Sequence, residues 1–66
     1  MTQDMVLQLL DMLQQGTAEC ITIGGMDITY THTYGGWDIA HHGSHTPSTL
    51  YDDIYECSGV VLALIR

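Results

Sequence analysis

Four histidines are the residues of this chain with the clearest capacity for metal chemistry. His41, His42 and His45 are close neighbours, and His32 lies upstream of them. Imidazole nitrogens are common zinc ligands, so a histidine-rich metal-binding module is one alternative for this protein. Successive residues of a strand point to opposite faces of a sheet, however, which would separate His41 from His42. We therefore expect histidines that end a strand and line a loop, with no metal site.

A short segment around these histidines resembles a known family. The string His41-His42-Gly43-Ser44, followed by Thr46 and Ser48, resembles part of the metallo-β-lactamase-fold proteins of the DNA-uptake type. In that family one histidine of the pair helps to hold the metals. The main ligand motif of the family, two histidines and an Asp-His pair on one loop, is absent from this chain. The resemblance therefore implies no catalytic role here.

The remaining catalytic patterns are also incomplete. Ser44, His45 and Asp52 could be assembled into a Ser-His-Asp set, but no nucleophile elbow or oxyanion glycines accompany them. Two Gly-Gly pairs lie between β-prone runs and no lysine follows them, unlike a phosphate-binding loop. We expect a protein that is not an enzyme and needs no cofactor.

The two cysteines are expected to be free thiols. No secretory signal precedes them, and disulfides are uncommon outside oxidising compartments. The predicted strand pattern places Cys20 on the polar sheet face, whereas Cys57 lies on the apolar side of a helix. A disulfide would need their Cα atoms within about 7 Å, and opposite faces make that unfavourable.

The charge balance excludes several classes of ligand. The chain has 66 residues with eight acidic side chains, one arginine and no lysine, giving a formal net charge of −7. Nucleic acids and anionic membranes require a basic surface, so we expect neither as a direct ligand. The longest apolar run, Val60 to Ile65, is far shorter than the ~20 residues that span a bilayer. A cytoplasmic protein is expected.

The whole chain, residues 1–66, is expected to be a single α+β domain. A helix is predicted over residues 3–15, capped by Thr2 and closed by Gly16. Its apolar residues follow helical spacing at Val6, Leu9, Leu10 and Leu13. The pairs Gly24-Gly25 and Gly35-Gly36 predict two tight hairpin turns, and hence a three-stranded antiparallel meander.

Both hairpins predict one apolar face and one polar face for this sheet. The predicted register pairs Ile23 with Met26, Ile21 with Ile28, Tyr34 with Trp37, His32 with Ile39, and Tyr30 with His41. Polar side chains gather on the other face, among them Asp27, Asp38 and His42. The apolar face needs a cover, and the flanking helices can supply it.

A second helix is predicted to begin at Thr46-Pro47 and to place Leu50, Ile54 and Cys57 in one apolar stripe. The run Val60 to Ile65 could instead be a buried strand, and we favour the helix. The predicted architecture is a two-layer sandwich, α-β-β-β-α, with both helices on one face of the sheet.

Five acids fall on predicted solvent-facing positions. Asp27 and Asp38 lie on the open sheet face, and Asp52, Asp53 and Glu56 lie on the exposed side of the second helix. Solvated surfaces ordinarily mix both signs of charge, and this one has no cation to do so. These five residues are the predicted partner-binding set, because a field of one sign attracts a basic surface.

In size, charge and architecture the chain resembles small phage-encoded anti-defence proteins, in particular anti-CRISPR proteins. That resemblance implies a non-catalytic inhibitor, present as a monomer or weak dimer in the bacterial cytoplasm. Its partner would be a basic, nucleic-acid-binding subunit of a CRISPR effector complex, blocked by shape or by DNA mimicry. The alternative to inhibition and metal binding is a structural homodimer module, formed through a sheet edge or through Val60 to Ile65.

Overall fold

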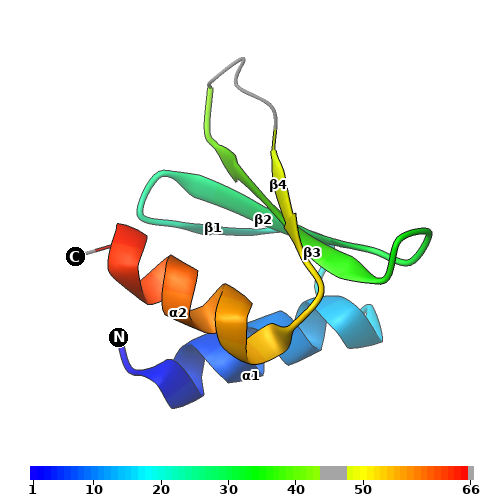
Figure 1. Cartoon of the computed structure of the whole chain (residues 1–66), viewed down its shortest axis with the longest axis horizontal. Helices are drawn as coiled ribbons and strands as arrows, with labels where there is room; N and C mark the ends of the chain where they lie inside the picture. The colour runs from blue at the N-terminus through cyan, green and yellow to red at the C-terminus, as the bar shows by residue number, and fades with distance from the viewer. Residues whose placement is uncertain (44–47, 66) are drawn as a thin grey trace.

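The protein folds into two layers, a sheet on one side and a pair of helices on the other (Figure 1). This computed structural model describes residues 1–43 and 48–65. The elements in chain order are α1 (Gln3–Gln15), β1 (Ile21–Ile23), β2 (Met26–Thr31), β3 (Gly36–His41), β4 (Thr49–Tyr51) and α2 (Ile54–Leu64). The predicted α+β class is confirmed, and both helices lie on the same side of the sheet. The predicted strand number is wrong, because four antiparallel strands pair in the order β1-β2-β3-β4.

Helix α1 begins and ends at the predicted residues. The Thr2 side chain accepts a hydrogen bond from the Met5 amide, and Gly16 closes the helix with a left-handed φ of 82°. Glycine adopts this conformation without the steric cost that a Cβ imposes. The inner side of α1 buries Val6, Leu10 and Leu13 against the sheet and α2.

The first hairpin has the predicted register. Gly24 and Gly25 have φ values of 55° and 79°, as a type I′ turn requires. Ile23 then pairs with Met26, and Ile21 pairs with Ile28.

The second hairpin has a longer turn than predicted. Gly36 is the first residue of β3, so residues 32–35 form the loop, and Gly35 alone has a left-handed φ of 70°. Strand β2 therefore pairs Tyr30 with Trp37, whereas the predicted partner of Tyr30 was His41. The slip of four residues is even, so the residues that remain in β2 and β3 keep their predicted faces. The predicted pairs His32 with Ile39 and Tyr34 with Trp37 are wrong, because His32 and Tyr34 lie in the loop and Ile39 pairs with Ile28.

Strand β4 occupies residues that were predicted to begin the second helix. Leu50 pairs with Asp38 of β3 and lies on the open sheet face, 42% exposed, and not in the apolar stripe of a helix. The predicted start at Thr46-Pro47 lies outside the described residues, and α2 begins at Ile54. The helical assignment of the final apolar run is confirmed as far as Leu64.

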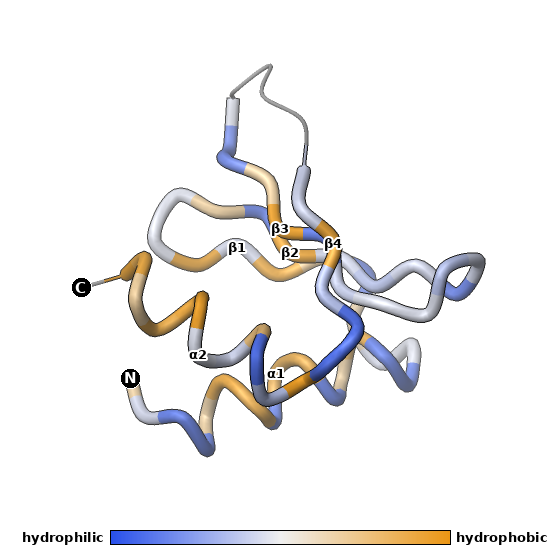
Figure 2. The backbone as a smooth tube through the Cα atoms, in the orientation of Figure 1, coloured by the Kyte–Doolittle hydropathy of each residue, from blue (hydrophilic) through white to orange (hydrophobic). Residues whose placement is uncertain are grey.

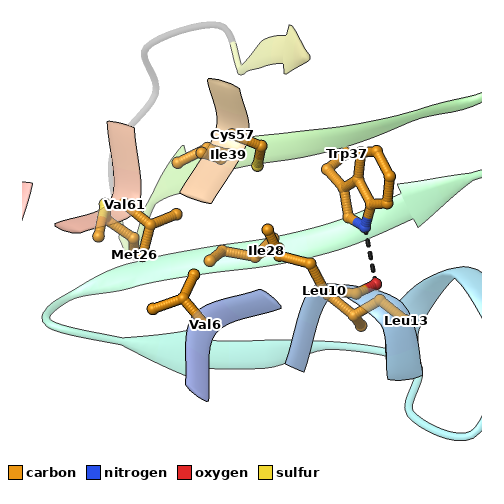
Figure 3. Close-up of a cluster of buried hydrophobic side chains, with 9 residues drawn as sticks. All are labelled: Val6, Leu10, Leu13, Met26, Ile28, Trp37, Ile39, Cys57 and Val61. Atoms are coloured by element: carbon orange, nitrogen blue, oxygen red, sulfur yellow. Dashed lines mark hydrogen bonds between the residues drawn. The ribbon is translucent and has the colours of Figure 1, made fainter. Parts of the chain in front are cut away.

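The core lies between the sheet and the helix pair (Figure 3). Its buried members are Val6, Leu10, Leu13, Met26, Ile28, Trp37, Ile39, Cys57 and Val61. The indole Nε1 of Trp37 donates a hydrogen bond of 2.8 Å to the Leu10 carbonyl, which ties β3 to α1. The two helices are also joined directly, because Gln3 Nε2 donates to the buried Ser58 Oγ at 3.3 Å.

Hydropathy along the backbone follows this arrangement, with hydrophobic segments in both helices and polar residues in the turns (Figure 2). Within the two described stretches, no helix is long and apolar enough to cross a membrane.

Candidate functional site

The sheet face that the helices leave uncovered holds two of the predicted binding residues. Asp27 pairs with Ala40, and Asp38 lies two residues before Ala40 on the same strand. The two residues are therefore diagonal neighbours, with their Cα atoms roughly 7–8 Å apart. Both residues are half-buried, with Thr22 and Ala40 opposite Asp27, and Thr29 and the exposed Leu50 opposite Asp38.

Asp27 is the centre of a hydrogen-bonded group that crosses three segments of the sheet. Thr22 Oγ1 donates to Asp27 Oδ1 at 2.7 Å, and His42 Nδ1 lies 2.8 Å from Asp27 Oδ2. The hydrogen bonds from His42 and Thr22 lower the pKa of Asp27, and the hydrogen bond to Asp27 raises the pKa of His42. The Asp27 side chain is 32% exposed and that of His42 is 71% exposed.

This group has the residue types of a catalytic triad but not its order of contacts. A triad needs the histidine to accept the proton of the hydroxyl nucleophile. Here Thr22 donates its proton to Asp27, and His42 contacts the other carboxylate oxygen. The histidine therefore cannot activate the hydroxyl in this geometry. Of the Ser-His-Asp set considered from sequence, Ser44 and His45 lie outside the described residues.

The second acidic group consists of Asp52, Asp53 and Glu56 and lies where β4 is followed by α2. Asp52 and Asp53 were predicted on the side of a helix, but both precede α2, and of the three acids only Glu56 is within it. Asp53 is the N-cap residue, and its Oδ1 accepts hydrogen bonds from the Tyr55 and Glu56 amides at 2.8 Å and 3.3 Å. All three acids are exposed.

The capping role of Asp53 was missed in the sequence, although a signal for it is present. Asp53 is followed three residues later by Glu56, which is the spacing of a capping box. The prediction began the helix at Thr46, which places Asp53 inside the helix and leaves no capping role for it.

The histidines are distributed along the sheet. His32 lies in the β2–β3 loop with its ring 4.8 Å from that of Tyr30, His41 ends β3, and His42 follows it. His45 lies outside the described residues. Among the residues that the structure describes, no three His, Cys, Asp or Glu side chains are close enough to hold a metal ion.

Both cysteines are free, as predicted. Cys20 is exposed just before β1, and Cys57 is fully buried in α2. Burial and the neighbouring Glu56 charge raise the pKa of the Cys57 thiol to about 11. This thiol therefore stays protonated, whereas Cys20 is accessible to reagents.

The aromatic residues divide between core and surface. Trp37 is buried in the core, and Tyr30 packs edge-on against it at 5.0 Å between ring centroids. Tyr34 and Tyr55 are 76% and 66% exposed. Tyr55 lines a shallow surface depression together with Asp52 and Asp53, so this acidic group has an aromatic neighbour.

Comparison of the chain with models of protein families, with curated proteins and with solved structures found no match.

Proposed function

We propose that this protein is a small non-catalytic inhibitor that binds a basic, nucleic-acid-binding surface of a larger protein. The proposed partner is a subunit of a CRISPR effector complex in the bacterial cytoplasm, whose DNA binding the inhibitor blocks. The observation that supports this most directly is the placement of the acids. All eight acids are at least partly exposed, five of them lie on the sheet face or at the start of α2, and the described residues contain no lysine or arginine.

The sheet face supports binding to an extended cationic surface. It is not covered by a helix, and each of its acids, Asp27 and Asp38, has a threonine opposite it on one neighbouring strand and an apolar residue on the other. A rigid sheet holds these carboxylates at fixed spacing, so little conformational entropy is lost when a partner binds. Carboxylates arranged in this way could substitute for phosphates in a basic channel.

The large excess of negative charge favours fast association. Fields of one sign steer a partner of the opposite sign, and they raise the association rate more than they slow dissociation. Salt shortens the range of this attraction from about 14 Å at 50 mM to about 4 Å at 500 mM. A complex formed through these acids should therefore weaken markedly with added salt.

The test uses guide-loaded CRISPR effector complexes of several types with their target DNA duplexes. In a mobility-shift assay, the protein should reduce target binding by at least one of them. For that effector, binding is then measured without DNA by biolayer interferometry at 50 and 500 mM salt. We expect the affinity to fall about tenfold or more over this range, mainly through slower association.

Paired charge variants locate the contact. Neutralising Asp27 and Asp38 to Asn should lower the affinity about two- to thirtyfold, because each exposed ion pair contributes about 0.2–1 kcal/mol. The matched control neutralises Asp4 and Asp11, two exposed acids of α1 outside the proposed surfaces. Equal losses in both double variants, or binding insensitive to salt, would contradict a charge-led contact through the sheet face. No inhibition across the effectors would contradict the proposed partner.

A further inference from the structure

Helix α1 has a second apolar stripe beside the one that it buries in the core. Its buried residues, at positions 6, 10 and 13, follow the i, i+4, i+7 spacing of one helix side. Three other apolar residues repeat this spacing one position earlier, at Met5, Leu9 and Met12. One position corresponds to about 100° around a helix, so this set lies next to the core stripe and not within it. We call Met5, Leu9 and Met12 the methionine stripe.

The methionine stripe is open to solvent. Met5 and Met12 are 50% and 39% exposed, and Leu9 is half-buried. Helix α2 lies on the other side of α1, because Gln3 Nε2 donates a hydrogen bond to Ser58 Oγ. Gln3 and Met5 are separated by roughly 160° around the helix axis. The stripe therefore faces away from α2, on a helix that lies along one border of the molecule (Figure 1).

Two carboxylates border this stripe. Asp4 and Asp11 each precede one of its methionines, and both are exposed. They are seven residues apart, so they lie on one side of α1 at about 10 Å from each other along the axis. Gln15 Nε2 donates to Asp11 Oδ2 at 2.8 Å, which holds this carboxylate against the helix surface. No lysine, arginine or histidine occurs in α1, so no cation of this helix balances the two charges.

An apolar stripe with carboxylates along one border is complementary to a basic amphipathic helix. Two helices that pack at about 20° remain side by side over several turns, so residues seven apart on one can meet residues seven apart on the other. Cations at i and i+7 of the partner helix would then reach Asp4 and Asp11 together. Unbranched methionine side chains adapt to the shape of such a partner.

The same charges disfavour two other occupants. A second copy of the chain would bring its own Asp4 and Asp11 to the contact without a cation to pair with them, and like charges placed together oppose binding. An anionic membrane surface would be repelled for the same reason.

We propose that the methionine stripe binds a basic amphipathic helix of a partner protein. The apolar side of that helix packs on Met5, Leu9 and Met12, and two of its cations, seven residues apart, lie beside Asp4 and Asp11. This contact uses α1 and not the open sheet face, so it is independent of the proposed function.

The test titrates the full chain, labelled with ¹³C at the methionine methyl groups, with a helical peptide of leucine and lysine. The peptide has about 14 residues, with a leucine stripe at helical spacing and lysines seven apart along its border. The Met5 and Met12 methyl signals should shift, whereas that of Met26, which is 1% exposed, should stay in place. A peptide with glutamate in place of lysine, and a scrambled peptide of the same composition, should each bind at least tenfold more weakly.

Variants separate the apolar contact from the charges. Met5→Gln combined with Met12→Gln removes apolar contact area but keeps good helix formers, and it should weaken peptide binding about tenfold or more. Leu64→Gln is the matched control, because Leu64 is a similarly exposed apolar residue, at 47%, on α2. It should leave the affinity unchanged. Neutralising Asp4 and Asp11 to Asn should weaken binding about two- to thirtyfold.

Several results would overturn the inference. These are equal affinity for the scrambled peptide, unchanged binding by the double methionine variant, and shifts centred on the sheet face. A dimer in sedimentation equilibrium that the double methionine variant dissociates would also overturn it, because a second copy would then cover the stripe. Failure here leaves effector inhibition through the sheet face in place, and a lack of inhibition leaves peptide binding by α1 in place.

Discussion

Gly36→Ala tests the contact that places β4, and with it the acidic depression, beside β3. A Cβ at Gly36 would lie 2.7 Å from the Tyr51 carbonyl oxygen and 2.9 Å from Leu50 Cδ1. Ordinary van der Waals contacts need about 3.5 Å, so β4 must move away by roughly 0.5–1 Å. Because the nearest obstacle is a backbone atom, no side-chain rotation can relieve it.

The cost can be set against the stability of the whole domain. Overpacking of this kind destabilises proteins by about 1–3 kcal/mol. A chain of 66 residues has a total stability of roughly 3–10 kcal/mol. At about 4–8 °C per kcal/mol for a small domain, Gly36→Ala should lower the Tm by about 4–24 °C.

The chain offers a matched control in Gly59→Ala. Gly59 lies inside α2 with nothing within 4 Å of an added Cβ. Alanine is favoured over glycine in a helix by about 0.5–1 kcal/mol, so this variant should raise the Tm by about 2–8 °C.

Thermal unfolding followed by circular dichroism and Trp37 fluorescence measures both changes. A Gly36→Ala protein as stable as the wild type would refute the reasoning, because it would mean that β4 does not lie against Gly36.

Two further predictions concern titratable side chains. Because the hydrogen bond to Asp27 raises the pKa of His42, the stability from this pair is complete below the ordinary histidine value near 6.5 and is lost as pH rises through the raised pKa. The lowered pKa of Asp27 keeps its carboxylate charged at pH 5.5. His42→Ala should therefore destabilise the protein more at pH 5.5 than at pH 9 in urea unfolding, and equal losses would contradict the pairing. With Ellman's reagent at pH 8, Cys20 should react at least a hundredfold faster than Cys57, since a thiol of pKa about 11 is only about one-thousandth ionised there. Two thiols reacting at one rate would contradict the burial of Cys57.

Capping and turn residues in the sequence correctly predicted α1 and the first hairpin, because neighbouring residues determine these elements. The cap at Thr2 and the left-handed Gly16 gave correct bounds for α1. Gly24 and Gly25 gave the correct first turn because both need positive φ. Gly36 looks the same in the sequence, but it is required for a different reason, the close approach of β4. The neighbouring residues in the sequence do not show whether a glycine is needed for a positive φ or for the close approach of another strand.

That difference also explains what was missed in the candidate site. The predicted register would pair Asp27 with residue 44, whereas the true register pairs it with Ala40 and brings His42 within hydrogen-bonding distance. Strand β4 has three residues, too few for an alternating pattern, and Leu50 fits a helical stripe equally well. The excess of acidic over basic residues, in contrast, follows from composition alone.

The contact between α1 and α2 has a consequence for synthesis of the chain. Each sheet pairing joins strands that are consecutive in the sequence, so the hairpins can form as they leave the ribosome. The core cannot close in this way, because Gln3 of α1 meets Ser58 of α2, 55 positions later. Until α2 has emerged, α1 and the sheet expose the apolar surfaces that α2 will cover, so completion of the fold awaits nearly the whole chain.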